Sequence, residues 1–547
     1  MKNAFLKKIL TPISYKNIPN VKEFYIPEVN ENAEKSKENL EKEISVSGSI
    51  NDNLNFIKTA FNFENNKDII IREFKLQNKK DAFIAYLDGM VDRNIINNFI
   101  LRPLMNDPSS LNTEDSIFER VIETNQAKKL TIQKDVIYGI LTGDTAVYLD
   151  GKDYYVLCET KGFEKRAVDK PHNEAVIKGS QEAFSENLRT NITLIRKIIK
   201  NNNLTTEFLE IGDENRNLCA ITYLKGIINP AIVDEVKRRI NGIKTDFING
   251  SGMLEQFIED SPMSIIPTVL STERPDVVAS HIVEGKISII AEGTPFAIIV
   301  PITISALLVS PEDSALRWQY GTLLRIIRII ALFLATLLPG IYIAITTYHQ
   351  EMIPTELLLA IAIARENVPF PTIVEILLME FSFELIREAG VRIPGMLGTT
   401  IGIIGVLVVG QASVQADLVS PVLIVIIATT GLANYTIPDF SFSTGIRIIR
   451  LFFIILGAFL GFYGISIGIV ILLSFLVDMK SFGVPFLSIS IPKTRKSFNK
   501  FIKYPIWKQE LRPDEVNPLK LRRQPKVSRR WIQENPKSSY DRKDEDE

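Results

Sequence analysis

The sequence is poor in the residues on which enzyme active sites and metal centres commonly depend. It contains only two cysteines and three histidines in 547 residues, and His172, His281 and His349 are far apart in the chain. It also lacks a P-loop, a GxSxG nucleophile elbow, a CxxC pair and an HExxH helix. We therefore expect that the chain is not an enzyme and that it binds no metal or other cofactor.

The cysteines and the N-terminus indicate where the first half of the chain resides. Cys158 and Cys219 lie in strand-like segments, and two buried, reduced thiols are the simplest interpretation, which suits a reducing compartment. Residues 1–10 lack the apolar run and small-residue cleavage site of a secretory signal peptide. Both observations predict that this half stays in the cytosol.

Charge is balanced over the chain, with 63 Lys and Arg against 64 Asp and Glu, but hydropathy divides it. Residues 1–50 read as a flexible polar lead-in. Short helical and strand-like patterns alternate in 51–160 and again in 161–285, which predicts two cytosolic α/β lobes. Residues 286–480 carry the apolar runs of an α-helical polytopic transmembrane domain. A basic polar tail, 481–547, follows, and its lysines and arginines place it in the cytosol.

The number of membrane crossings is not fixed by the apolar runs alone. There are five apolar segments, at 296–309, 326–347, 396–416, 418–437 and 448–477. Because both ends of the chain are expected in the cytosol, the number of crossings must be even. Either the short first segment, which contains Pro301, is re-entrant, or residues 355–386 form a further crossing despite their charges.

Residues 355–394 combine an apolar composition with many charged groups. Glu380, Glu384 and Glu388 recur every four residues, so a helix places them on one face. One interpretation is an interfacial helix whose charges are solvated or hold subunits together. Another is a carboxylate ring that attracts cations at a channel mouth in an oligomer. A proton relay is a third.

The next segment, 396–416, has no charged residue but is rich in small and polar ones. Close helix packing at its glycines is one interpretation. The other is a pore lining, in which polar groups replace the hydration of an ion and valines form a hydrophobic gate. The candidate ion path consists of Thr399, Gly402, Val406, Val409, Gln411 and Ser413.

Several short strings give a more specific indication than composition. They include Asn187-Leu188-Arg189-Thr190-Asn191, Glu273-Arg274-Pro275-Asp276, His281-Ile282-Val283-Glu284-Gly285, Ser310-Pro311-Glu312-Asp313, Ala364-Arg365-Glu366 and Ser481-Phe482-Gly483-Val484-Pro485. With these strings the chain resembles the GerA family of spore germination proteins, A-subunit type, over about residues 143–491.

The resemblance implies a subunit of a nutrient germinant receptor in the inner membrane of a spore. It implies assembly with a permease-like B subunit and a lipoprotein C subunit, and an oligomer of the A subunit that acts as a nutrient-gated cation channel. The basic tail is expected to contact membrane lipid rather than nucleic acid. Alternatives are a non-conducting signalling scaffold and the A-like protein associated with the dipicolinate-release channel. A secondary transporter would need inverted repeats, which we do not find in the sequence.

Overall fold

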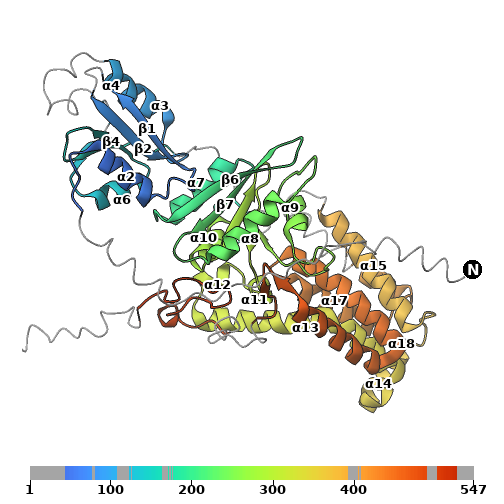
Figure 1. Cartoon of the computed structure of the whole chain (residues 1–547). Coiled ribbons are helices and arrows are strands. Elements are labelled where there is room, and N and C mark those ends of the chain that lie inside the picture. The colour runs from blue at the N-terminus through green and yellow to red at the C-terminus, as the bar shows by residue number, and fades with distance from the viewer. Residues whose placement is uncertain are drawn as a thin grey trace, which may run out of the picture.

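The structure is a computed structural model. It describes residues 44–76, 80–106, 122, 124, 126–162, 170–171, 174, 176–391, 405, 408–488 and 502–525. These residues form two α/β lobes and a bundle of helices, which follow one another along the chain (Figure 1). The expected order of two lobes and a helical part is therefore confirmed.

The first lobe is a five-stranded antiparallel sheet with helices on both faces. In spatial order its strands are β1 (Ile69–Lys75), β2 (Asp81–Leu87), β4 (Thr145–Leu149), β5 (Tyr155–Cys158) and β3 (Ala127–Leu130). Its helices are α2 (Ile50–Ala60), α3 (Arg93–Ile95), a π-helical turn (Ile96–Leu101), α4 (Arg102–Asn106) and α6 (Gln133–Leu141). Alternate residues of β2 separate the two faces: Phe83 packs with Ile57 of α2, whereas Ile84 packs with Leu104 of α4.

The second lobe has the same design. In spatial order its strands are β6 (Leu204–Ile211), β7 (Asn217–Leu224), β9 (Ile287–Ala291), β10 (Ala297–Val300) and β8 (Leu270–Thr272). Its helices are α7 (Leu188–Ile198), α8 (Pro230–Asn241), α9 (Ser251–Ile258) and α10 (Pro275–Val283). α7 and α10 pack on one face of the sheet, and α8 and α9 pack on the other.

The two lobes are copies of one fold. Counted from the first strand of each lobe, both sheets have the order 1-2-4-5-3. Gly143 and Gly151 border β4, and Gly285 and Gly293 border β9 at the corresponding positions. All four glycines have positive φ values, of 93°, 84°, 96° and 86°, which side chains with a Cβ rarely adopt. The chain therefore contains a tandem structural repeat.

The second lobe extends beyond the boundary expected at residue 286. Residues 296–309, expected as a short or re-entrant apolar segment of the membrane part, form β10 and α11 (Ile304–Leu307) instead. β10 pairs with β9 on one side and β8 on the other, and all its residues are buried. A strand covered on both faces is apolar throughout, so its composition imitates a short membrane segment.

After α12 (Glu312–Ala315), the helical bundle consists of α13 (Trp318–Tyr348), α14 (Thr355–Ala364), α15 (Thr372–Val391), a helix over residues 408–415, α17 (Pro421–Tyr435) and α18 (Phe440–Asp478). Of the described helices, α13 and α18 are long and apolar enough to cross a membrane.

α18 reverses its direction at Gly461, where the backbone leaves the helical region with φ 60° and ψ −142°. A Cβ at Gly464 or Gly468 would meet Leu456, so the residues after the break lie beside those before it. The hydroxyl of Tyr348 donates to the carbonyl oxygens of Ala458 and Phe459, at 2.9 and 3.1 Å, next to the break. The long apolar segment is therefore a helical hairpin.

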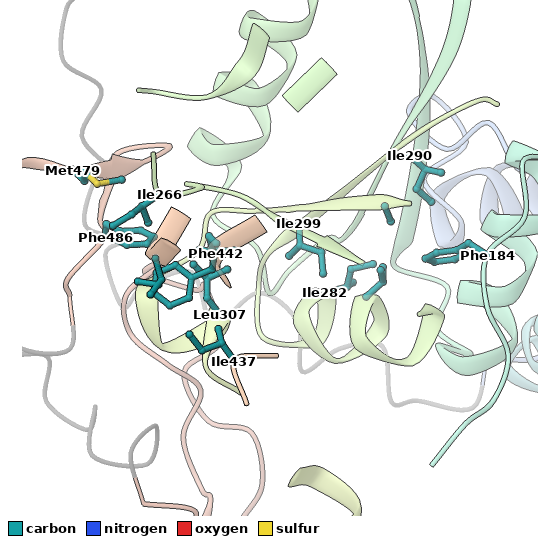
Figure 2. Packing of buried hydrophobic residues seen from close by; sticks show 14 of the residues in the cluster. Phe184, Ile266, Ile282, Ile290, Ile299, Leu307, Ile437, Phe442, Met479 and Phe486 are labelled. Atoms are coloured by element: carbon teal, nitrogen blue, oxygen red, sulfur yellow. The ribbon is translucent and has the colours of Figure 1, made fainter. Parts of the chain in front are cut away.

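Both ends of this hairpin meet the second lobe. Figure 2 shows Phe442 near the start of α18 and Met479 and Phe486 after its end, in one cluster with Ile266 of the second lobe. Ser264 Oγ also donates to Met479 Sδ at 3.8 Å. The same apolar cluster continues to Ile290 in the sheet, so lobe and bundle share a core.

Replacing Gly457 by alanine should loosen the contact between α13 and α18. A Cβ there would lie 2.6 Å from the carbonyl oxygen of Gly340, and overpacking costs about 1–3 kcal/mol. The midpoint of thermal unfolding of the detergent-solubilised chain should therefore fall. Gly431→Ala is the matched control, because its nearest neighbour, Phe383 Cε1, would be 3.7 Å away. An equal fall in both variants would contradict the predicted contact.

Candidate functional site

The charged residues of α15 bind this helix to its neighbours. Glu380 pairs with Arg450 of α18 at 3.1 Å, and Glu384 pairs with Arg447 one turn earlier in α18. The two pairs occur in opposite order along α15 and α18, so the helices run antiparallel here. Because Glu380 and Arg450 are both buried, each neutralises a charge that would be costly to bury alone.

Glu375 forms a second connection at the other end of α15. It is 1% exposed and pairs with Arg365, at the end of α14, at 3.1 Å. Its other carboxylate oxygen accepts a hydrogen bond of 3.0 Å from the backbone N–H of Ser420, where α17 begins. α15 is therefore tied to α14, α17 and α18 by carboxylates.

The three glutamates singled out from the sequence have different surroundings. Glu380 is buried, whereas Glu384 and Glu388 are exposed. Arg387, between them, lies over the ring of Phe440 at 5.6 Å from its centroid. In the single chain the first two glutamates thus face arginines of α18.

The candidate ion path is described in part. Thr399, Gly402 and Val406 lie outside the described residues. In the helix over 408–415, Ser413 is buried, Val409 is half-buried and Gln411 is exposed.

This helix has a packed face and an exposed face. A Cβ at Gly410 would be 3.5 Å from Ile424 of α17, so the glycine lies on the packed face. Val408, Gln411, Ala412 and Gln415 are exposed, and their spacing places them on one stripe. Two amide side chains therefore point away from the bundle.

A buried charge cluster marks the start of α13. Asp313 is fully buried and pairs with Arg328 at 2.7 Å and Arg325 at 3.3 Å. Lys503, from the C-terminal part of the chain, donates to the carbonyl oxygens of Asp313 and, at 2.8 Å, Leu316. This cluster fixes the first turns of α13 to the C-terminal segment.

The described C-terminal residues pack on the second lobe, although a tail on the membrane surface was expected. Arg512 Nε donates to the carbonyl oxygen of Val283, and the N–H of Leu519 donates to that of Ile227, both at 2.8 Å. Val516 is 2% exposed in the core of the lobe. Before this segment, β11 (Lys480–Ser481) and β12 (Val484–Pro485) form a small hairpin, whose Phe482 lies under Arg239. Backbone N–H and C=O groups that are removed from water need hydrogen-bond partners, and the second lobe and this segment supply such partners to each other.

α7 forms the joint between the two lobes. Asn187 accepts hydrogen bonds from the N–H groups of Arg189 and Thr190 and so caps the helix. Arg189 pairs with Asp88 and Arg196 pairs with Asp68 at 2.6 Å, both in the first lobe. Positions 189 and 196 are seven residues apart and share one helical face. The face of α7 that carries Arg189 and Arg196 is therefore the one that binds the first lobe.

Arg274 organises the loop that precedes α7. Its side chain is 1% exposed, and it donates to the carbonyl oxygens of Glu174 and Ser180 at 3.0 and 2.8 Å and pairs with Asp276. Thr272 Oγ1 donates to the carboxylate of Glu174 at 2.8 Å. Burial raises the pKa of Glu174 to about 7.

Sequence reasoning missed several of these residues. Neither the arginines of α18 nor the pairs Asp68–Arg196 and Asp313–Arg328 were singled out. The signal for the α18 pairs was two arginines, Arg447 and Arg450, at the edge of a long apolar run, since charged groups in such a run seek partners. For the pairs with Asp68 and Asp313 no local pattern was available.

The described chain thus combines two repeated α/β lobes with a helical bundle that shares a core with the second lobe and contains two helices long and apolar enough to cross a membrane. Among the described residues no group of His, Cys, Asp and Glu could hold a metal ion. The chain belongs to the GerA family: the family described as Bacillus/Clostridium GerA spore germination protein matches residues 56–515.

Similar proteins come from several Bacillus species. Spore germination protein KA of Bacillus subtilis (strain 168) is 38% identical over 468 residues, 85% of this chain and 86% of that protein. Spore germination protein A1 of the same strain is 35% identical over 472 residues, 86% and 96% of the two chains. The N-terminal domain of the A subunit of the Bacillus megaterium spore germinant receptor GerK3 is 28% identical, over 48% of this chain and 97% of that one, with a TM-score of 0.35.

A further relative is named as a membrane protein. The uncharacterized membrane protein YfkQ of Bacillus subtilis (strain 168) is 37% identical over 448 residues, 82% of this chain and 87% of that protein. The comparisons confirm the family resemblance and the expectation that the chain is not an enzyme.

Arg450→Leu should destabilise the bundle more than the double change of Glu380 and Arg450 to leucine. The single change leaves a buried carboxylate without its partner, which costs about 3–5 kcal/mol, whereas replacing a whole buried pair by apolar groups is often nearly neutral. Thermal unfolding midpoints in detergent measure the difference. A double variant as unstable as the single one would contradict the pairing.

Glu174→Gln should reduce the pH dependence of lobe stability. Folded Glu174 keeps its proton up to about pH 7, whereas the unfolded chain releases it near the ordinary value of 4.5. The folded state thus binds more protons in this window, so its stability falls as the pH rises from 4.5 to 7. Unfolding midpoints between pH 5 and pH 8 should therefore fall less in the variant, while Glu214→Gln, at an exposed site, keeps the wild-type slope. If the unfolding midpoint of Glu174→Gln changed with pH as steeply as that of the wild type, Glu174 would be excluded as the source of this pH dependence.

Proposed function

We propose that the chain is the A subunit of a nutrient germinant receptor in the spore inner membrane, assembled with a permease-like B subunit and a lipoprotein C subunit. The names of its relatives KA and A1 as spore germination proteins support the process. The similarity to YfkQ, named as a membrane protein, and the two long apolar helices support the location.

We propose six membrane crossings: α13, α15, the apolar segment expected from composition at 396–416, α17 and the two arms of α18. α13 leaves the second lobe at Asp313, and the second arm of α18 returns to it at Met479. An even number of crossings keeps the lobes and the C-terminal segment on one side, which positive residues place in the cytosol.

Counting α15 as a crossing explains its ion pairs. A lone carboxylate in hydrocarbon costs several kcal/mol, so charged residues inside membranes are paired or face water. Glu375 and Glu380 are buried beside arginines, which satisfies this requirement. In this arrangement they hold the helices together, and the exposed members of the proposed carboxylate ring are Glu384 and Glu388.

The observation that supports a cation channel is the exposed stripe of the helix over 408–415. Gln411 and Gln415 point away from the bundle, where hydrocarbon offers no hydrogen-bond partner. In an oligomer of A subunits this stripe faces the axis, and the amide oxygens of the glutamines replace water around a monovalent cation. Val409, beside the stripe, then contributes to a hydrophobic gate.

A non-conducting scaffold is the second candidate. α7 connects the first lobe to the second through a buried ion pair, and a shared apolar core connects the second lobe to the bundle. This arrangement suits a protein that passes a signal from one partner to another. Cation flux through the purified chain separates the two candidates, because a scaffold conducts no ions.

Gln411→Leu should lower potassium flux through vesicles that contain the purified chain. An ion that loses one polar partner faces a barrier higher by about 1–3 kcal/mol, which is a fall of about 5- to 150-fold in rate. A potassium-sensitive dye measures the flux. Val425→Leu, at an exposed apolar position of α17, is the control and should conduct as wild type. Flux unchanged by Gln411→Leu would exclude this residue from the path, and absence of flux in the wild type would favour the scaffold.

A further inference from the structure

α9 has a broad apolar face that the second lobe covers only in part. Leu254 and Ile258 are buried in the core of the lobe. Met253 and Phe257, next to them around the helix, are 37% and 49% exposed. A helix that packs against a single core buries its apolar stripe there. The exposed part of the apolar face of α9 therefore suits contact with another apolar surface.

The segments on either side of α9 add to this exposed apolar surface. Phe247, before the helix, is 53% exposed, and Met263 and Ile265, after it, are 85% and 47% exposed. We call Phe247, Met253, Phe257, Met263 and Ile265 the α9 patch. Large apolar residues gathered within so short a stretch of chain mark a site of contact with another apolar surface.

The α9 patch adjoins both ends of the α18 hairpin. A Cβ at Gly445, in the first turns of α18, would touch the carbonyl oxygen of Ile265. After the second arm, Met479 accepts a hydrogen bond from Ser264 Oγ, and the N–H of Phe482 donates to Asp260 at 2.5 Å. The loop after α9 therefore lies where both arms of α18 leave the bundle.

The length of α18 sets this loop at the level of a membrane surface. The first arm, from Phe440 to Gly461, contains 22 residues, which at about 1.5 Å per residue extend over about 33 Å. This is close to the thickness of a bilayer's hydrocarbon core. The start of α18, and with it the loop after α9, then coincides with the boundary between hydrocarbon and headgroups.

A carboxyl group of α9 close to the start of α18 has a raised pKa. Burial, followed by the nearby Glu259 and Asp439, raises the pKa of Glu255 on α9 to about 7. A carboxyl group that is about half protonated at pH 7 opposes the approach of α9 to lipid less than a fully ionised carboxylate does. The raised pKa of Glu255 is therefore compatible with a lipid contact.

We propose that the α9 patch inserts into the headgroup region of the cytosolic leaflet, so that the second lobe binds lipid directly, beside the helices that cross the membrane. Phe and Met side chains suit the boundary between headgroups and acyl chains. The inference rests on the proposed membrane crossing by α18 but not on ion conduction. It gives the second lobe a fixed orientation on the membrane.

Site-directed fluorescence quenching of the full chain tests this contact. Cys158 and Cys219 are fully buried, so a single cysteine introduced at a surface position carries the label. Met263→Cys and Phe257→Cys report the α9 patch, Val470→Cys reports the exposed face of α18, and Tyr138→Cys reports an exposed site on the first lobe. The labelled chains are placed in phosphatidylcholine–phosphatidylglycerol nanodiscs whose lipids are brominated either near the headgroup or deep in the acyl chain.

The four positions give distinct expected results. Labels at Met263 and Phe257 should lose about half of their fluorescence with shallow bromine and less with deep bromine, as for an interfacial segment. The label at Val470 should be quenched, and that at Tyr138 should not. Quenching at Val470 without quenching in the patch would overturn the lipid contact and leave the membrane crossing intact, which is the result expected if a second copy of the chain covers the patch. Absence of quenching at Val470 would overturn both the lipid contact and the membrane crossing by α18. Quenching at Tyr138 equal to that at Met263 and Phe257 would show that the quenching is not specific to the α9 patch and would overturn the lipid contact.

Discussion

The shared apolar core between the second lobe and the two ends of α18 is the contact on which the arrangement of the chain depends. Ile266 of the lobe meets Phe442 and Met479, which are far apart in sequence and are brought together only because α18 turns back at Gly461. Burial of such side chains stabilises by about 1.5–3 kcal/mol each. A displacement of either arm of α18 therefore disturbs its packing on the second lobe, and a displacement of the lobe disturbs the packing of both arms.

Polar contacts extend this coupling in both directions. α7 uses Arg196 and Asp68 to hold the first lobe to the second, and Asp313 uses Arg328 and Lys503 to hold the start of α13 to the C-terminal segment. Buried ion pairs are sensitive to geometry, because separating the partners leaves a desolvated charge. In a chain built this way, a displacement of the lobes is passed to the helices through buried contacts.

The sequence predicted the two lobes and the apolar helical part, because hydropathy and the alternation of short patterns are local signals. It did not reveal that the lobes repeat one fold, although Gly143 and Gly151 have the same spacing as Gly285 and Gly293. Pairs of glycines are weak signals in a single sequence. The assignment of 296–309 to the membrane part was wrong because an inner strand such as β10 and a short membrane segment have the same composition.

The candidate site was predicted in part for a similar reason. The spacing of Glu380 and Glu384 predicted one helical face, but their partners Arg447 and Arg450 come from a helix that the chain reaches some sixty residues later. Only tertiary structure brings such residues together. The exposed positions of Gln411 and Gln415 likewise depend on which face of their helix packs on α17, and composition does not determine that.

Cysteine accessibility in oriented membrane vesicles tests whether α18 crosses the membrane, turns at Gly461 and returns. Tyr463, beside the turn, and Tyr138, on the first lobe, are 71% and 63% exposed. A membrane-impermeant thiol reagent should label Tyr463→Cys only from the side of the membrane opposite to the one from which it labels Tyr138→Cys. Labelling of both positions from the same side would contradict a hairpin that crosses the membrane and returns.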